Sequence, residues 1–236
     1  MSIFSRRRGA AAPAPPTEGI SFGVESDTPL AEVLARVASG EVTRSVAASA
    51  LKRDRVENLE LRDCVLTEAQ TAALEEFLVR STLVRTIAFS HVTFASPAAF
   101  SRLCNGVAQN EGLRRITMTH ARLADDQAEK LVNAILLGNS PVAELDLSYN
   151  ALGSPADCIE KLKRHTKLET LNLSGNSLLC AETLSGAISG HWPALREVLL
   201  LRTQLSDEDA RVLKRAALLG AERFAEYSTH ARVVTT

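Results

Sequence analysis

One eleven-residue pattern occurs twice in the middle of the chain. Residues 142–152 read VAELDLSYNAL, and residues 168–178, which begin 26 positions later, read LETLNLSGNSL. In both copies leucines alternate with polar residues, and an asparagine and a final leucine follow. Such alternation predicts a short strand with one buried face, and its recurrence at a fixed separation predicts turns of chain that stack on one another.

The same register extends along most of the chain. We place period starts, separated by 28, 29, 29, 26 and 27 residues, at Val56, Val84, Leu113, Val142, Leu168 and Leu195. Each start is followed by two apolar residues at strand spacing, namely Leu59 and Leu61, Ile87 and Phe89, Ile116 and Met118, Leu145 and Leu147, Leu171 and Leu173, and Val198 and Leu200. These pairs predict one short strand in each period, with its apolar side chains facing a shared interior.

Signals for helix starts lie between the predicted strands. They are a capping box at Thr67 and Gln70, serine followed by proline at Ser96 and Ser154, and Ser206 with Asp209. Ala128, Leu131, Val132 and Ile135 follow helical spacing, and Gly138 is placed to end that helix. Each strand is therefore expected to be followed by a helix.

Asn150 and Asn176 stand where the chain bends away from its strand. A buried side-chain amide at such a bend can satisfy backbone groups that the bend leaves unpaired. The other periods carry Cys64, Val92, Ala121 and Thr203 at this position. Val92 and Ala121 depart furthest from an amide, which leaves the geometry of those two bends open.

The motif Leu/Val-x-x-Leu-x-Leu-x-x-Asn-x-Leu, with periods of 26 to 29 residues, resembles the ribonuclease-inhibitor type of leucine-rich repeat. Tropomodulin and the Ran GTPase-activating protein also use this type. The resemblance covers about residues 56–228. It implies an α/β leucine-rich-repeat solenoid, a curved parallel sheet with outer helices, of about six repeats.

The two ends of the chain differ from this pattern. Residues 27–55 show two apolar helical faces and are expected to form a helical N-terminal cap, while residues 229–236 are expected to be a free tail. Residues 222–227 are the candidate for a degenerate seventh strand. Residues 1–26 are expected to be a tail that is flexible or ordered by a partner, and arginines 6–8 leave a mitochondrial presequence as the alternative.

Composition narrows the class of protein. The formal charge is -1 and the pI about 6.5, so no overall attraction to nucleic acid or to an anionic membrane is expected. No apolar run reaches the ~20 residues that a membrane-spanning helix needs. The four cysteines are widely spaced, which favours a reducing compartment over a disulfide framework. We expect a cytoplasmic protein, with the cytoskeleton or cilium as candidate hosts.

The predicted outer face of the sheet is the candidate partner-binding surface. Side chains at equivalent strand positions should form ladders on it, because neighbouring strands lie about 4.8 Å apart. The candidate contact residues are Glu60, Arg62, Thr117, Asp146, Ser148, Asn172, Ser174, Leu199 and Leu201. Leu199 and Leu201 would form an exposed apolar contact, unless the C-terminal segment folds over them.

Two further groups of residues are candidates for a functional role. His91 and His120 occupy one position in adjacent periods, between Asp63 and Tyr149, and could bind a metal, respond to pH or simply form a solvated turn. Residues 161–167 hold a basic cluster of Lys161, Lys163, Arg164, His165 and Lys167. That cluster could meet an acidic partner or only complement a helix C-terminus.

Motifs for nucleophilic, phosphate-binding or metal-dependent catalysis do not occur in the sequence. We therefore expect a non-catalytic protein–protein interaction module, an adaptor or structural subunit of a larger assembly, with no cofactor, metal, small-molecule substrate, membrane insertion or nucleic-acid partner. One alternative is a regulator of an enzyme, such as an inhibitor or GTPase-activating protein. Another is a subunit of a mitochondrial assembly.

Overall fold

The computed structural model describes residues 40, 56–138, 140–177, 181–224 and 232–235. The expected N-terminal tail and almost all of the expected helical cap lie outside these residues. Within them, seven strands form one sheet in the order β1-β3-β5-β6-β7-β8-β9, and every neighbouring pair is parallel. The strands are β1 (Asn58–Arg62), β3 (Thr86–Ser90), β5 (Arg115–Thr119), β6 (Glu144–Asp146), β7 (Thr170–Asn172), β8 (Glu197–Leu200) and β9 (Arg232–Thr235).

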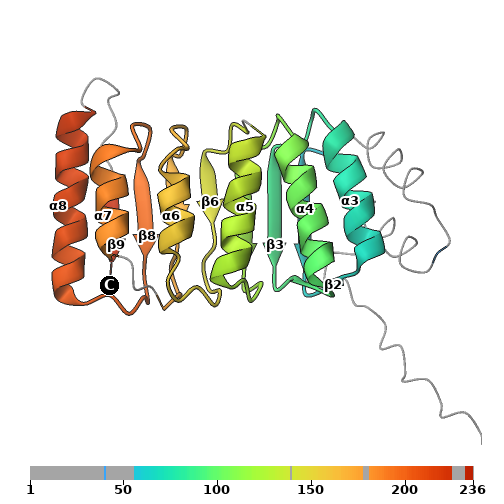
Figure 1. Ribbon diagram of the computed structural model, residues 1–236, viewed down its shortest axis with the longest axis horizontal. Coiled ribbons are helices and arrows are strands. Elements are labelled where there is room, and N and C mark those ends of the chain that lie inside the picture. The colour runs from blue at the N-terminus through green and yellow to red at the C-terminus, as the bar shows by residue number, and fades with distance from the viewer. Residues whose placement is uncertain (1–39, 41–55, 139, 178–180, 225–231, 236) are drawn as a thin grey trace, which may run out of the picture.

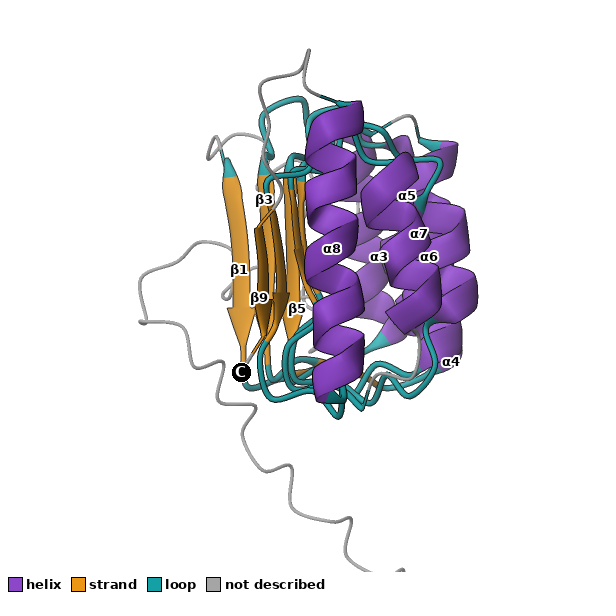
Figure 2. Cartoon of the chain, turned by 90° about the vertical axis from the view of Figure 1, so that its left-hand side faces the viewer, coloured by secondary structure: helices purple, strands orange, loops and turns teal. Residues whose placement is uncertain are grey.

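The described helices cover one face of this sheet (Figure 2), in the order in which they follow the strands (Figure 1). They are α3 (Glu68–Arg80), α4 (Pro97–Gln109), α5 (Asp125–Leu137), α6 (Ala156–Leu162), α7 (Ala181–Gly190) and α8 (Asp207–Arg223). A second, two-stranded sheet pairs β2 (Val65–Leu66) with β4 (Thr93–Phe94). The arrangement is a mixed α/β fold built on a parallel sheet.

The core lies between the sheet and the helices. The predicted inward pairs are all buried, and strand pairing aligns Leu59, Ile87, Ile116, Leu145, Leu171 and Val198 in one row. Each helix adds aliphatic residues, so the buried side chains form a single cluster along the molecule. Alternation on the strands and helical spacing between them therefore meet in one interior.

Helix starts follow the predicted caps in three of four cases. Thr67 and Gln70 form the capping box of α3, Ser96 caps α4 ahead of Pro97, and Ser206 with Asp209 caps α8. The prediction for Ser154 is wrong, because α6 begins at Ala156 and the Ser154 N–H donates to Asp125 Oδ2 at 2.9 Å. Pro155 stands at the N-cap position of α6 and forms no side-chain cap hydrogen bond.

Side-chain amides close the bends after β6 and β7, as predicted; Asn176 is buried and Asn150 is half-buried. Asn150 Nδ2 donates to the carbonyls of Met118, Leu147 and Ser148 at 2.7 to 3.2 Å, and its Oδ1 accepts from the N–H groups of Ala121 and Leu123. Asn176 repeats this one unit later and accepts from the Asn150 N–H at 3.0 Å. Each amide thus bonds its own bend and the bend before it.

The bends that lack an asparagine share one backbone feature with the others. The residue after each strand region has a positive φ, 50° at Asp63, 55° at His91, 54° at His120 and 55° at Tyr149. The equivalent values are 69° at Gly175 and 54° at Arg202. Val92 therefore leaves the bend geometry unchanged, whereas the bend at Ala121 contains a second residue of positive φ, Arg122 at 55°. There Asn150 Oδ1 accepts from the Ala121 N–H at 2.9 Å.

A second row of buried side chains closes the opposite bends, before each strand. Ser81 Oγ accepts from the Val84 N–H, and Asn110 Nδ2 donates to the Leu78 and Ser81 carbonyls at 2.7 and 3.0 Å. Two units after Asn110, His165 Nε2 lies 2.6 Å from the Val142 carbonyl oxygen, and in the unit after that Trp192 Nε1 donates to the Leu162 carbonyl at 3.0 Å. Both edges of the core are therefore sealed by polar groups that backbone partners satisfy.

The seventh strand exists, but the predicted position is wrong. Residues up to Arg223 belong to α8, and the strand that pairs with β8 is β9, in what was expected to be a free tail. Gly220 is one of the buried residues of α8. It lies inside α8 because a Cβ there would stand 2.5 Å from the Ile188 carbonyl oxygen of α7, so glycine permits the two helices to approach closely.

The described helices lack the length and apolar character of a membrane-spanning segment. None of those in the described part of the chain is both long enough and apolar enough to span a bilayer.

Replacing Asn150 with alanine should lower the free energy of unfolding by about 2 kcal/mol or more, because several buried backbone groups lose their partner at once. Denaturant unfolding followed by circular dichroism measures the change. The exposed neighbour Ser177→Ala is the control and should shift it by less than about 0.5 kcal/mol. Equal stability of the two variants would contradict the role assigned to the amide.

Candidate partner-binding surface

The sheet face opposite the helices carries the predicted central ladder. Strand pairing aligns Glu60, Ala88, Thr117, Asp146, Asn172 and Leu199, as expected, and adds Val234 of β9 at the end. No described helix lies over this face (Figure 2). The alternating pattern that buries the leucines therefore presents every second strand residue away from the core.

The ladder is polar on four of its first five strands, the exception being Ala88 on β3. Glu60 and Arg62 on β1 are exposed, and Thr117 on β5 is half-buried. Asp146 and Asn172 are joined, since Asn172 Nδ2 donates to Asp146 Oδ2 at 2.9 Å. Each also accepts from the N–H two residues ahead, so these two side chains brace the strand ends as well as facing outward.

Two of the predicted contact residues are not available. Ser148 and Ser174 are each only 4% exposed, and the Ser174 hydroxyl accepts from the Leu201 N–H at 3.0 Å. The prediction that they line the accessible wall is therefore wrong. The strand-like alternation ends at Asp146 and Asn172, and the chain turns both serines into the bend.

The C-terminal end of the face is apolar. Leu199 and Leu201 are half-buried, and Val234, half-buried on β9, is the register partner of Leu199. The described C-terminal strand lies beside β8 and not across it, so Leu199 and Val234 adjoin on neighbouring strands, and Leu201 follows directly after β8. We call these three residues the apolar strip. Val234 is not among the predicted contact residues, because the last strand was predicted at residues 222–227 and lies at Arg232–Thr235.

An ion pair at the amino ends of the strands was also missed. Arg115 Nε lies 2.6 Å from Glu144 Oε2, and Arg115 Nη2 donates to Glu144 Oε1 at 2.8 Å. Hydrogen bonding to Glu144 raises the pKa of Arg115 above its ordinary value. The two residues are register partners on β5 and β6, so opposite charges at one position of adjacent periods were the available signal.

At the carboxyl ends of the strands, rings form a column. The ring centroids of His91 and His120 are 4.4 Å apart, and those of His120 and Tyr149 are 4.7 Å apart, all in stacked orientation. Bonds between successive bends hold the spacing, from the His91 N–H to Thr119 O and from the Tyr149 N–H to Ser174 O. We call His91, His120 and Tyr149 the ring column.

The ring column carries backbone strain. All three residues have φ near 55°, a conformation that costs an L-residue with a side chain roughly 1 kcal/mol or more. All three are exposed, so burial does not offset that cost. Strained residues whose side chains gather at the surface are candidates for a binding role.

A metal site at His91 and His120 was one of the alternatives for these residues. Within the described ranges, no group of three or more His, Cys, Asp or Glu side chains could hold a metal ion. The two imidazoles are stacked face to face, so their nitrogens do not converge on one point.

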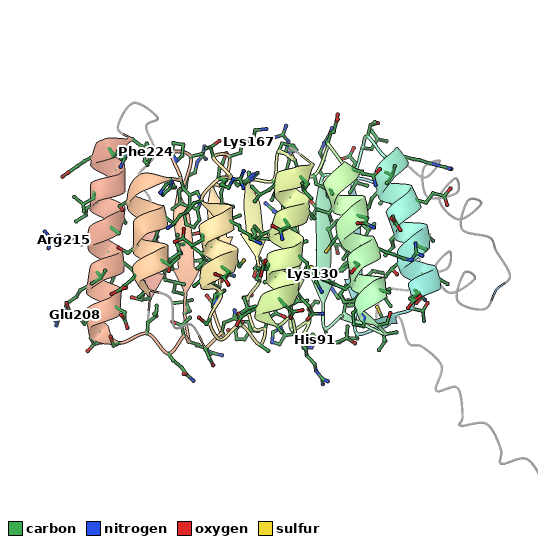
Figure 3. The ribbon with its side chains drawn as sticks, in the orientation of Figure 1. His91, Lys130, Lys167, Glu208, Arg215 and Phe224 are labelled. Carbon is green, nitrogen blue, oxygen red and sulfur yellow. The ribbon has the colours of Figure 1, made fainter. Side chains whose placement is uncertain are left out.

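The basic cluster of residues 161–167 is smaller than its sequence suggests. His165 is buried, Lys161 pairs with Glu129, and Lys163 pairs with Glu160. Arg164 and Lys167 remain exposed. Figure 3 shows Lys167 at the edge opposite His91, so the cluster and the ring column lie on different edges of the molecule.

Three cysteines are buried, and the structure gives them no reactive character. Burial raises the pKa of Cys64 to about 11 and that of Cys104 to about 12, so both stay protonated at neutral pH. Cys104 and Cys158 lie on α4 and α6 among core residues, as predicted.

Stability should fall as the pH drops below about 6.5, the ordinary pKa of histidine, because burial lowers the pKa of His165 in the folded protein. The unfolded chain then binds more protons than the folded one, so protonation favours unfolding. His165→Gln, which can still donate to the Val142 carbonyl, should flatten the decline in unfolding free energy between neutral pH and pH ~5. The exposed His191→Gln is the control. A decline that persists unchanged in His165→Gln would refute the assignment.

Comparison with known proteins gives one match. Residues 167–190, which contain β7 and α7, match the Leucine Rich Repeat family model. A search of curated proteins found no match. Leucine-rich repeats generally mediate protein–protein interaction and are typically non-catalytic. The chain therefore carries a leucine-rich repeat, and the parallel sheet with its row of helices is consistent with that fold.

Proposed function

We propose that residues 56–228 form about six leucine-rich repeats, stacked as a solenoid, that bind a protein partner through the sheet face opposite the helices. The protein would act as a non-catalytic adaptor or structural subunit of a larger assembly. The family match to residues 167–190 supports the class of module. The equal bend geometry at six positions supports the extension to the other units.

The observation that carries this proposal is the uncovered face of the sheet. Its ladder changes from charged and polar residues at β1 to the apolar strip of Leu199, Leu201 and Val234 at β8 and β9. Interfaces combine an apolar centre that excludes water with a polar rim that fixes orientation. The apolar strip and the exposed Glu60 and Arg62 would supply these two parts.

The cellular setting is part of the proposal. A cytoplasmic assembly of the cytoskeleton or cilium is the host we favour, because a helical cap followed by a few repeats resembles the layout of tropomodulin. Fluorescent tagging of the C-terminus in the native cell tests the setting, and a mitochondrial signal would contradict it.

Replacing Leu199 with glutamate should reduce recovery of the native partner about tenfold or more, because a carboxylate in the apolar strip must be desolvated on binding. The measurement is affinity purification from the native cell with quantitative mass spectrometry. Leu218→Glu is the matched control, since it makes the same change at a side chain that is 68% exposed on α8.

Both variants should keep the wild-type circular dichroism spectrum and melting temperature within a few degrees. The proposed surface would be rejected if Leu199→Glu recovered the wild-type set of proteins. It would also be rejected if Leu218→Glu lost the partner equally.

A further inference from the structure

The ring column has one closed end and one open end. At the closed end Tyr149 covers Gly175, where an added Cβ would lie only 2.4 Å from Tyr149 Cδ1. At the other end the next position along the ladder is Asp63, whose N–H donates to the Ser90 carbonyl at 3.0 Å. Asp63 carries no ring, so among the described residues nothing stacks on the outer face of His91.

Asp63 stands one strand spacing beyond that open face. Its φ of 50° matches the φ of 55° at His91, so both side chains leave the backbone in the same direction. Asp63 is exposed, and its carboxylate forms no hydrogen bond or ion pair with the described residues. Among the described residues, a flat ring face and a carboxylate without a partner therefore adjoin each other at the surface.

The surrounding charge favours a cation. Glu60 and Arg62 of β1 are the nearest exposed charged residues in sequence, and together with Asp63 they give two negative charges and one positive. The local balance is one negative charge. Lys130 and Arg122 belong to a later unit, on the side of His91 away from the open end.

A guanidinium group satisfies both features at once. It is planar, stacks on aromatic rings and forms paired hydrogen bonds with a carboxylate. An ammonium group would form an ion pair with the carboxylate but would not stack on the His91 ring. A phenyl ring would stack on His91 but would not pair with the carboxylate. The chemistry thus selects arginine over lysine and over aromatic residues.

We propose that His91 and Asp63 form a recognition site for an arginine side chain of the protein partner. The guanidinium continues the ring column by one step and pairs with the Asp63 carboxylate. This inference rests on the proposed function, since it supplies the residue type by which a partner on the sheet face would be oriented.

The test uses the full chain and a defined peptide, so it needs no native partner. Acetyl-Gly-Arg-Gly-amide is titrated into the protein while the histidine ring signals are followed by NMR. The signals of His91 should shift, and acetyl-Gly-Lys-Gly-amide should bind at least about threefold more weakly. Equal binding of the two peptides would overturn the proposal.

Variants separate the two halves of the site. Asp63→Asn should weaken arginine-peptide binding about three- to tenfold, whereas Asp207→Asn, an equally exposed acid at the first turn of α8, should not. His91→Gly accepts the positive φ and removes only the ring, so it should abolish the preference for arginine over lysine. Unchanged binding in Asp63→Asn would refute the site.

Failure of this inference can be told apart from failure of the proposed function. Leu199→Glu alters the apolar strip and should leave the peptide titration unchanged. A protein that loses its partner through Leu199→Glu but does not prefer the arginine peptide keeps the proposed function and loses this site.

Discussion

The structure depends on satisfying the backbone polar groups at two bends in every strand–helix unit. A strand that gives way to a helix, and a helix that gives way to a strand, leave N–H and C=O groups at the edges of an aliphatic core, where each unpaired group is costly. Here the partners are supplied from inside, by Asn150 and Asn176 at one edge and by Asn110, His165 and Trp192 at the other. Several of these side chains bond two units at once, so closing a bend also fixes the position of its neighbour.

This constraint creates the candidate surface. Because every bend has the same φ and bonds to the next bend, side chains at equivalent positions stand about one strand spacing apart. That spacing is close to the contact distance of flat rings, which is why His91, His120 and Tyr149 stack. It also aligns Asp146 with Asn172 and Arg115 with Glu144. Asp63 and Arg202 have the same φ as the ring residues without carrying a ring, so the bend itself does not require the rings.

The structural role of a residue could be predicted from the sequence where its partners lie in the same strand–helix unit or the next one. The alternating leucines, the capping boxes at Thr67 and Ser206 and the amides of Asn150 and Asn176 all act within their own unit or the next, and their roles are confirmed. The expected boundaries of the tail and cap, and the partner itself, stay predictions.

Reasoning from local pattern fails where a neighbouring unit decides. Gly220 has the sequence appearance of a helix end, but the approach of α7 places it inside α8 and displaces the last strand. The Ser154 N–H donates to Asp125 Oδ2, and the Ser174 hydroxyl accepts from the Leu201 N–H. His165 looks like a member of a surface cluster until the Val142 carbonyl shows it to be a core group. In each case the deciding contact lies about one period away, where single-period patterns carry no information.

The most direct test of this account is a double-mutant cycle between Asn150 and Asn176. The Asn150 N–H donates to Asn176 Oδ1 at 3.0 Å, and both amides bond to the Leu147 carbonyl, so the two residues share partners. Unfolding free energies of the wild type, Asn150→Ala, Asn176→Ala and the double variant give the coupling energy. The account predicts a coupling of about 1 kcal/mol or more. Strictly additive losses would show that each bend is closed independently and would contradict it.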